Sequence, residues 1–399
     1  MKQNYIILKQ PVRPDNDPFG GLALPGMRNF DEAADFGPIG LDIGQEELDD
    51  SDIPMVVNDP STMMIAPSMP MHLIEPMERD ILAAPVAGSI PWGIQAVKSN
   101  TSRFNGSGVT IAVLDTGIDK GHAAFAGVNI VEKDFTGAGN GDTNGHGTHC
   151  AGTIFGRVVA GVRIGVAPGV TRALIGKVLA PGRGDSPSVA AAIQWAVESG
   201  ANVISMSLGI DFPGAVRQME NQGMPTEMAV SRALQGYRLN VALFEGLAEM
   251  IGAMSGFGKH CVLIAAAGNE SQRIVNPSFK IAVAPPAVSR GFISVAALGE
   301  SPNGWRIAPF SNTGAGLCGP GVGITSAKPG GGFATMSGTS MATPHVAGVA
   351  ALHAQALQQA GALSQSMLSA SIAGGATKVG LAPGFDPFDV GMGMVQAPQ

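Results

Sequence analysis

From about residue 105 onward, short continuous apolar runs alternate with longer segments whose apolar residues recur at helical spacing. Continuous apolar runs are typical of strands that are buried on both faces of a sheet. Alternating strands and helices predict a doubly wound α/β fold of three layers, with a mostly parallel sheet between helices. In such sheets, ligands bind at the carboxyl ends of the strands. The strands are expected at residues 108–114, 173–179, 201–206, 261–266, 292–298 and 323–327.

One helix carries recognisable signals at both ends. Ser186 is the expected N-cap, Pro187 fits the first helical position, and Gly200 ends the segment. A second helix-forming stretch, rich in methionine, covers residues 211–258 and interrupts the alternation of strands and helices. We interpret it as a helical insertion in the main domain.

The first ninety residues have a different pattern. A strand is expected at residues 5–9, and residues 13–52 are rich in Asp, Glu, Pro and Gly and end in an acidic run. We interpret this acidic insert as a solvated, flexible loop. Residues 75–92 have the composition of a linker, so the region predicts a small α+β or partly disordered unit. Further strand-like pieces lie at residues 54–57, 63–65 and 71–74.

The composition is that of a globular protein with a large core. Hydrophobic residues make up 45% of the 399 positions and charged residues 14%, which is unlike a disordered chain. The formal net charge of −7 gives no basic footprint for nucleic acid. No apolar stretch approaches the roughly 20 residues of a membrane span, so we expect neither nucleic acid nor a membrane as a partner.

The N-terminus and the cysteines both indicate a reducing compartment. The apolar run after Met1 is too short for a signal peptide, so a cytoplasmic location is expected, with secretion by a signal-less route as the alternative. Cys150, Cys261 and Cys318 are odd in number and widely spaced. We therefore favour buried free thiols over a disulfide.

Three short segments place a reactive side chain beside glycine. Asp115 ends an apolar run in AVLDTG, His146 lies between two glycines in GHGTHCAGT, and Ser340 opens a helix in MSGTSMATPHVAG. Taken singly, each has an ordinary alternative: a turn or cap for the aspartate, a metal pair with His149 for His146, and a common turn for the serine. Because the sequence offers no third ligand nearby, we discount zinc and expect His149 to be structural.

Together the segments follow the order Asp, His, Ser, which is the triad order of subtilisin. They closely resemble the signatures of subtilisin-like serine proteases, the subtilases, and the resemblance runs from about Trp92 to Val395. The GHGTHCAGT form is more similar to the proteinase K branch. The resemblance implies that Asp115 orients the base, His146 is the general base and Ser340 is the nucleophile.

A fourth segment, IAAAGNE, resembles the oxyanion segment of the same family. It implies that the side-chain amide of Asn269 stabilises the tetrahedral oxyanion together with the backbone N–H of Ser340. The tripeptide that starts at Ser207 resembles the strand edge that pairs with the substrate backbone. The substrate-binding residues implied by the resemblance are Ser207, Leu208, Gly209, Ala267 and Gly268.

The sequence departs from the family at two places. Many relatives hold a structural calcium ion in the loop after the helix of the catalytic histidine, but residues 157–163 here offer no carboxylate or amide and carry two arginines. Because calcium needs six to eight oxygen ligands, we expect no metal or cofactor at this loop, while a calcium site elsewhere stays open. The insertion at 211–258 is longer than the usual link and, because it follows Gly209, is expected to border the substrate cleft.

Other reactive side chains have ordinary interpretations. His122 and His345 match histidines that are structural in the family, and Asp119 is expected in a turn. Cys150 follows the second histidine of its motif, where it could lie beneath His146.

The resemblance implies a serine endopeptidase that acts on protein or peptide substrates. Residues 91–399 would form the peptidase domain, and residues 1–90 an inhibitory pro-segment that lies in the cleft and is removed by self-cleavage within 75–92. An unrelated regulatory appendage is the alternative for the N-terminal region. Two other functions stay open: a peptide ligase or cyclase with the same triad, and a non-proteolytic peptide-binding member of the fold.

Overall fold

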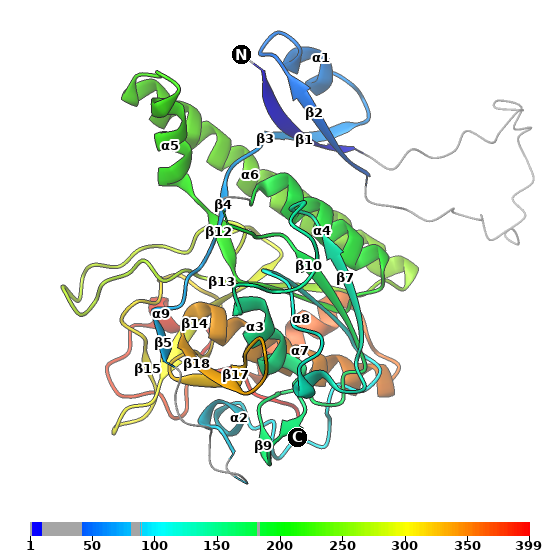
Figure 1. Ribbon diagram of the computed structural model, residues 1–399, viewed down its shortest axis with the longest axis vertical. Coiled ribbons are helices and arrows are strands. Elements are labelled where there is room, and N and C mark those ends of the chain that lie inside the picture. Colours follow the sequence, from blue (N-terminus) through cyan, green and yellow to red (C-terminus); the bar gives the residue numbers. More distant parts are fainter. Residues whose placement is uncertain (1, 10–41, 81–87, 89, 182–183) are drawn as a thin grey trace, which may run out of the picture.

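The structure is a computed structural model, and it describes residues 2–9, 42–80, 88, 90–181 and 184–399. It confirms the predicted three-layer α/β architecture, with a central sheet of eight strands between layers of helices (Figure 1). The acidic insert before residue 42 and most of the expected linker after residue 80 lie outside the described residues.

The central sheet has the strand order β15-β14-β13-β11-β6-β10-β7, with β16 paired beside β14. Among the described strands of this sheet, β15 is antiparallel and the others are parallel. The predicted strands form where both faces are covered, and in β6 every residue after Thr110 is buried. Strand β7 was not predicted because it is an edge strand without a continuous apolar run. The strands are β6 (Thr110–Asp115), β7 (Asn129–Asp134), β10 (Arg172–Lys177), β11 (Val203–Met206), β13 (Val262–Ala266), β14 (Phe292–Gly299), β15 (Arg306–Ile307) and β16 (Leu317–Pro320).

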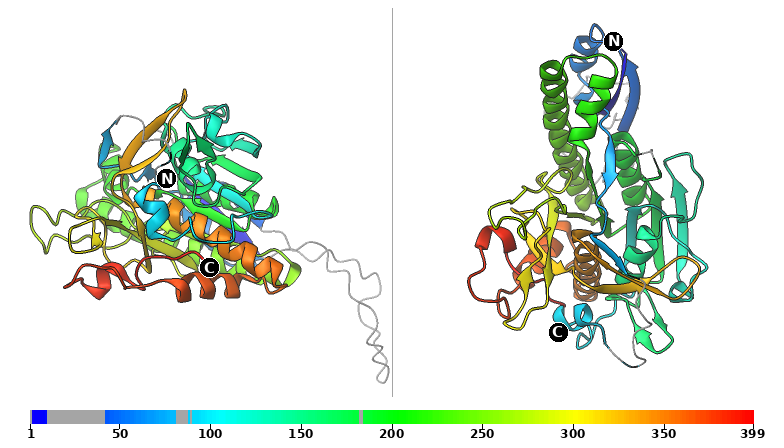
Figure 2. Two further views of the ribbon diagram at one scale, coloured as in Figure 1. Left: turned by 90° about the horizontal axis from the view of Figure 1, so that it is seen from below. Right: turned by 60° about the vertical axis from the view of Figure 1, so that its left-hand side comes forward.

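Helices cover both faces of the sheet. α3 and α7 pack together on one face, whereas α4 and α6 lie together on the other (Figure 2). The rings of Phe244 on α6 and Phe292 on β14 have centroids 6.0 Å apart, so the C-terminal half of α6 belongs to the covering layer. The helices of the peptidase body are α2 (Trp92–Ala96), η1 (Ala123–Phe125), α3 (His146–Phe155), α4 (Ser186–Glu198), η2 (Ser255–Phe257), α7 (Thr339–Gln359), α8 (Gln365–Gly375) and α9 (Pro387–Val390).

The predicted N-cap of α4 is wrong by one residue. Asp185 is the N-cap, and its carboxylate accepts a hydrogen bond from the N–H of Ser188 at 2.9 Å. Aspartate and serine are equally good caps, so the local sequence could not separate them. Ser186 instead uses its hydroxyl to accept a hydrogen bond from the N–H of Met69 at 3.1 Å, a contact across the fold.

Residues 323–327 form a strand, as predicted, but it lies outside the central sheet. β17 pairs antiparallel with β18 in a hairpin, and the other edge of β18 pairs with β5. The prediction of a linker is therefore wrong at residues 78–80, which form β5 because β18 offers them an open edge. These short strands are β5 (Glu78–Asp80), β8 (Val158–Val159), β9 (Val162–Arg163), β17 (Ile324–Ala327) and β18 (Phe333–Ser337).

The N-terminal region forms a separate three-stranded antiparallel sheet in the order β2-β1-β3. The prediction of a flexible loop is wrong at residues 42–48, which form β2. Its charged side chains are exposed, and an edge strand tolerates charge because it pairs through its main chain. The predicted strand at 54–57 is also wrong, because Pro54 fits the first turn of a helix. The elements are β1 (Gln3–Lys9), β2 (Asp42–Leu48), α1 (Ile53–Val57) and β3 (Thr62–Pro67).

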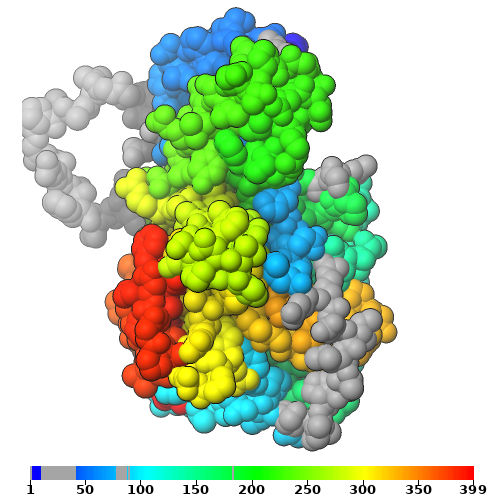
Figure 3. All heavy atoms as spheres, turned by 90° about the vertical axis from the view of Figure 1, so that its left-hand side faces the viewer, coloured from blue at the N-terminus to red at the C-terminus, as the bar shows by residue number. Residues whose placement is uncertain are grey.

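The insertion is helical, as expected, and forms α5 (Phe212–Asn221) and α6 (Thr226–Met254). The N-terminal sheet packs on α6 through β3, and the two lie side by side at one end of the molecule (Figure 3). The side-chain amide of Asn240 on α6 donates a hydrogen bond to the carbonyl of Pro67 at 2.8 Å. Among the described helices, none combines the length and the apolar character that crossing a bilayer requires.

Candidate active site

Asp115 and His146 form a buried pair. Asp115 is the last residue of β6, and His146 is the first residue of α3. His146 Nδ1 lies 2.8 Å from Asp115 Oδ1 and 3.0 Å from Oδ2, so the carboxylate accepts the Nδ1 proton and leaves Nε2 as the basic nitrogen. Burial by itself lowers the pKa of His146, but the adjacent Asp115 carboxylate outweighs it and holds that pKa well above its ordinary value.

A second buried carboxylate fixes the start of α3. Asp142 Oδ1 accepts hydrogen bonds from the N–H of Gly145 at 2.8 Å and the hydroxyl of Thr116 at 2.9 Å. Asp142 Oδ2 accepts from the N–H and the hydroxyl of Thr148, at 2.9 and 2.6 Å. Because Thr116 directly follows β6, Asp142 ties the end of that strand to the helix that carries His146. The sequence analysis missed Asp142, since a lone aspartate before the motif has no distinctive pattern.

Ser340 lies in the first turn of α7. Its hydroxyl donates a hydrogen bond to the carbonyl of Ile74 at 2.8 Å. His146 Nε2 is buried and has no hydrogen-bond partner among the described residues. The serine hydroxyl is thus turned to a carbonyl from the N-terminal region of the chain rather than to the histidine.

Asn269 is held so that its amide faces the same region. Its Oδ1 accepts hydrogen bonds from the N–H and the hydroxyl of Thr339, both at 2.9 Å. Its Nδ2 then donates to the carbonyl of Glu75 at 2.9 Å. The preceding Gly268 has a φ of +110°, and a Cβ there would lie 2.3 Å from Asn312 Nδ2, so only glycine fits this turn.

Residues 71–80 cross this site from one side to the other. On one side β4 pairs antiparallel with β12, and the N–H of Ile74 donates to the carbonyl of Ser207 at 3.3 Å. On the other side β5 pairs with β18, and the N–H of Met77 donates to the carbonyl of Ser337 at 2.9 Å. The segment is therefore bound as an added strand on both sides of the serine hydroxyl. The two further strands are β4 (Met71–Leu73) and β12 (Leu208–Ile210).

The segment meets the serine and the asparagine through two different carbonyls. Ser340 Oγ contacts the oxygen of Ile74, whereas the Asn269 amide contacts the oxygen of Glu75. Attack requires that the carbonyl approached by the serine also places its own oxygen on the oxyanion donors. The next residue is Pro76, which restricts Glu75 to extended conformations. The bound segment thus lies in an arrangement that disfavours attack on either carbonyl.

Comparison with known proteins assigns the chain to a family. The model of the subtilase family (Peptidase S8) matches residues 106–393. The chain belongs to the subtilase family. M-protease of Shouchella clausii (strain KSM-K16) is 33% identical over 288 residues, which are 69% of this chain and 62% of that protein. Subtilisin BL of Lederbergia lenta is 34% identical over 278 residues, which are 67% of this chain and 84% of that protein.

A fungal relative extends the match. Subtilisin-like serine protease Pen c 1 of Penicillium citrinum is 33% identical over 327 residues, covering 76% of this chain and 67% of that protein. The chain spans 62% of the length of M-protease and of the alkaline protease of Alkalihalobacillus alcalophilus.

The predicted substrate-binding residues of this subtilase divide into two groups. Ser207, Leu208 and Gly209 lie along the edge on which the segment pairs, and the last two are strand partners of β4. Ala267 and Gly268 lie beside Asn269. The N–H of Ala267 bonds to β14, and that of Gly268 bonds to a hydroxyl at the start of α7. Contact with a substrate stays a prediction for all five residues.

Cys150 lies beneath the histidine, where the sequence analysis placed it. Its Sγ is 3.7 Å from His146 Nδ1 and 3.4 Å from the carbonyl oxygen of Ser340. Burial raises the pKa of the Cys150 thiol, so it stays protonated at neutral pH. All three cysteines are buried and free, which agrees with the preference for thiols over a disulfide.

The three other histidines that the sequence analysis discussed bond to the main chain. Burial lowers the pKa of His149 to about 3 and that of His345 to about 4, so both are neutral. His149 Nε2 lies 3.0 Å from a carbonyl of β17, and His345 Nδ1 lies 2.8 Å from a carbonyl within α7. His122 accepts a hydrogen bond from the N–H of Ala124 at 3.0 Å, and Asp119 caps a turn at Gly121 at 3.1 Å. These contacts suit structural roles.

An arginine side chain holds the loop at residues 157–163, where the absence of calcium stays a prediction. The Arg163 guanidinium donates to the carbonyl of Gly165 at 3.1 Å, of Val166 at 3.0 Å and of Ser99 at 3.2 Å. These oxygens already face a positive charge, and residues 157–163 add no carboxylate. Within the described residues, the ligating atoms of Asp115, His146 and Cys150 lie within 4.8 Å of one another, but this cluster is the site already described.

Proposed function

We propose that this subtilase is a serine endopeptidase that hydrolyses protein or peptide substrates, and that its N-terminal region holds it in an inhibited state. One observation carries the proposal: the chain's own residues 71–80 lie across the site as a substrate would, with carbonyls on Ser340 and on Asn269. The names of the relatives, which include alkaline protease and subtilisin, support the same activity.

His146 is the general base in this proposal. The Asp115 carboxylate holds the Nδ1 proton, so Nε2 is free to take the proton of Ser340 when the hydroxyl turns from Ile74 to the histidine. Ser340 Oγ then bonds to the scissile carbonyl carbon, and the carbonyl electron pair moves to the oxygen. Asp115 stabilises the imidazolium that forms.

Asn269 stabilises the oxyanion. Its amide is aimed by the two hydrogen bonds that its Oδ1 accepts from Thr339, so it needs no reorganisation when charge develops. The oxyanion collapses, the C–N bond breaks, and the histidine gives its proton to the leaving amine. Water then attacks the acyl group with the histidine as base, which releases the acid and regenerates Ser340.

The path of the bound segment supports an endopeptidase. Main-chain pairing holds the segment on both sides of Ser340, through β12 on one side and β18 on the other. A chain can therefore pass through the site without ending in it, which an enzyme needs to cut within a polypeptide. Pairing through the main chain also accepts many sequences.

The same segment accounts for inhibition. It occupies the groove that a substrate needs, while the nucleophile and the oxyanion donor engage two different carbonyls. The N-terminal sheet adds a second attachment by packing on α6. Loss of residues 1–90, or of a part that includes this segment, would free the groove.

The test is covalent labelling of the full chain, incubated until activity on casein is constant. We expect a fluorophosphonate to label Ser340, wild-type protein to lose an N-terminal piece, and Ser340→Ala to stay full-length, unlabelled and inactive. Ser366→Ala, which removes an exposed serine of α8, is the matched control and should behave as wild type.

Two results would count against the proposal. Labelling at another residue would remove the nucleophile, and full activity of intact wild-type protein would remove the inhibitory role of the N-terminal region. The masses of the products separate hydrolysis from aminolysis, because transfer to an amine adds the mass of the amine rather than that of water.

A further inference from the structure

Hydrogen bonds hold the main chain of the bound segment well beyond the residues next to Ser340. The N–H of Met71 donates to the carbonyl of Gly184 at 2.9 Å. Two residues further from Ser340, the carbonyl of Met69 accepts a hydrogen bond from the N–H of Ser186 at 3.0 Å. The N–H of Met69 donates to the hydroxyl of Ser186 at 3.1 Å. These contacts are to residues 184–186 at the start of α4, where Pro70 and Asp185 form an antiparallel bridge, and they extend the main-chain contacts of the segment beyond β4.

The helical insertion adds two more main-chain contacts. The N–H of Asp211, just before α5, donates to the carbonyl of Pro70 at 2.9 Å. The amide of Asn240 on α6 donates to the carbonyl of Pro67 at 2.8 Å. Gly236 lets the segment approach α6, since a Cβ there would lie 3.2 Å from the sulfur of Met69. The insertion therefore binds the backbone of residues 67–70.

The receptors for this stretch belong almost entirely to the peptidase body. The N-terminal sheet supplies a hydrogen bond at Ser68, whose N–H donates to the carbonyl of Asn4 at 2.7 Å. The groups at Gly184, Ser186 and the insertion belong to the peptidase body and not to the N-terminal region. A substrate paired with β12 in the same direction would run directly onto them.

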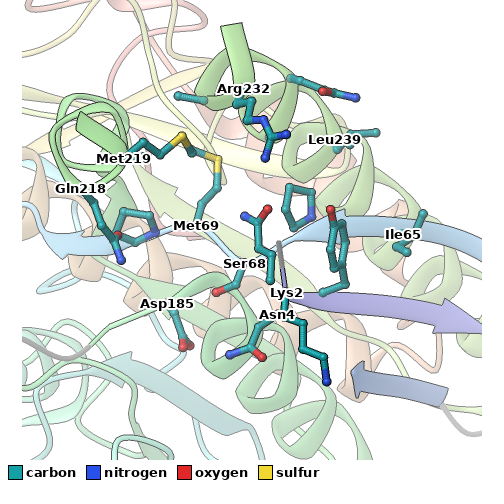
Figure 4. A pocket seen from close by; sticks show the side chains of 18 of the residues that line it. Lys2, Asn4, Ile65, Ser68, Met69, Asp185, Gln218, Met219, Arg232 and Leu239 are labelled. Atoms are coloured by element: carbon teal, nitrogen blue, oxygen red, sulfur yellow. The ribbon is translucent and has the colours of Figure 1, made fainter. Parts of the chain in front are cut away.

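Side chains along this path alternate in their surroundings. Met69 and Met71 are 3% and 6% exposed, whereas the side chain of His72 is 41% exposed. Beside Ser68 lies a cavity of about 930 Å³, with walls from α5, α6 and the N-terminal strand (Figure 4). The groove thus suits apolar side chains at the positions of Met69 and Met71. At the position of Ser68 it leaves room for a side chain larger than serine.

We propose that the helical insertion 211–258 is a substrate-recognition element. In this proposal the groove binds an extended polypeptide, with at least eight residues before the cleaved bond at the positions of residues 67–74. The substrate class is then long unfolded segments with apolar side chains at the positions of Met69 and Met71. This inference rests on the proposed endopeptidase function. Because the contacts are to the main chain, they favour length and extension rather than one sequence.

The test uses the full chain, incubated until its activity is constant, and a nested series of quenched fluorogenic peptides. All peptides share four residues before the cleaved bond, equivalent to 71–74, with methionine at the position of Met71. The longer ones add two residues, equivalent to 69–70, or four, equivalent to 67–70, with methionine at the position of Met69. The longest peptide adds four hydrogen bonds, two at the position of Met69 and one each at the positions of Pro70 and Pro67. Because each has a modest net strength, we expect kcat/KM to rise by about tenfold from the shortest to the longest peptide. Asn240→Leu removes the donor to Pro67 and should reduce that ratio severalfold.

Controls separate recognition from folding. Glu227→Gln, at an exposed position in the first turn of α6, should keep the wild-type ratio. If Asn240→Leu lowers the melting temperature, Ser186→Ala gives a second reading, because it removes the hydroxyl that binds the N–H of Met69 while it keeps the main chain. Cleavage of all peptides at one rate, whatever their length, would overturn this inference and leave the proposed function intact. Failure to cleave any peptide would refute the proposed function itself.

Discussion

At the residue scale, the protonation of His146 depends on one neighbouring charge. The imidazole is fully buried, and burial disfavours its cationic form, but Asp115 Oδ1 lies 2.8 Å away and favours it. The net pKa lies well above the ordinary histidine value. A general base must be neutral to accept a proton, so this residue sets the lowest pH at which the site can work.

The first prediction is therefore an acidic limb at unusually high pH. The raised pKa keeps His146 protonated at pH values above the ordinary histidine pKa of about 6.5. As the pH is lowered, kcat/KM should therefore begin to fall before a pH of about 6.5 is reached. In Asp115→Asn the charge that raises this pKa is gone, so the limb should move to lower pH, and kcat should drop by up to about 10,000-fold through loss of the correct tautomer. Peptide hydrolysis measured across pH checks both shifts.

The control for this profile is Glu198→Gln, which removes an exposed carboxylate at the end of α4. It should leave the limb in place. An acidic limb in wild type below pH 6.5, or a limb in Asp115→Asn that moves upward, would contradict the assignment of His146 as the titrating base.

At the scale of elements, an arginine joins the hairpin β8–β9 to neighbouring segments of the fold. Arg163 ends β9, and its guanidinium bonds to carbonyls at Gly165, Val166 and Ser99, in residues that are all buried. A guanidinium offers several fixed donors and so can satisfy carbonyls from separate segments at once. Three carbonyls depend on this side chain, which makes it a structural cation carried by the chain.

The second prediction is that stability here depends on Arg163 and not on calcium. Arg163→Met leaves buried carbonyls without a donor, at a cost of about 1–3 kcal/mol for each unsatisfied group, so the melting temperature should fall by several degrees. Arg163→Lys keeps the charge but has fewer directed donors, so its melting temperature should lie between those of wild type and Arg163→Met. Scanning calorimetry with and without a calcium chelator measures this, with the exposed Arg306→Met as the control. A large loss of wild-type stability in chelator would show that another calcium site supports the fold.

Sequence could predict features whose residues are neighbours along the chain, but it could not predict contacts between distant segments. Sequence alone could identify the segments around Asp115, His146 and Ser340, because in each of them the reactive side chain lies close in sequence to glycine and to the end of a strand or the start of a helix. The hydrogen bond between Asp142 and Thr116 could not be predicted, because these two residues meet only after β6 and α3 pack. The strand β2 was missed for a related reason: its charges suggested a loop, whereas its pairing depends on the distant main chain of β1.

At the scale of the whole molecule, the N-terminal region contacts the peptidase body both through its sheet and through the segment in the groove. The sheet touches α4 through β2 and α6 through β3, and the continuation of the chain fills the groove beside Ser340. The insertion takes part in both, since α6 supports the sheet and also bonds to the segment at Pro67. The sequence analysis expected it to border the cleft, and its contact with residues 67–70 lies at the far end of that groove.

The last prediction concerns whether the split contacts slow cleavage of the bound segment next to Glu75. Between the two paired halves, Ser340 and Asn269 engage neighbouring carbonyls, and Pro76 restricts Glu75 to extended backbone. In Pro76→Ala, Glu75 gains conformations in which one carbonyl can meet both groups. A misplacement of about 1 Å can cost about 100-fold in rate, so we expect self-cleavage next to Glu75 to speed up by at least about tenfold. Intact-mass measurements over time follow the cut, and Pro70→Ala in the same segment should stay near the wild-type rate. Equal rates and equal cut sites in Pro76→Ala and wild type would mean that the split contacts do not protect the segment.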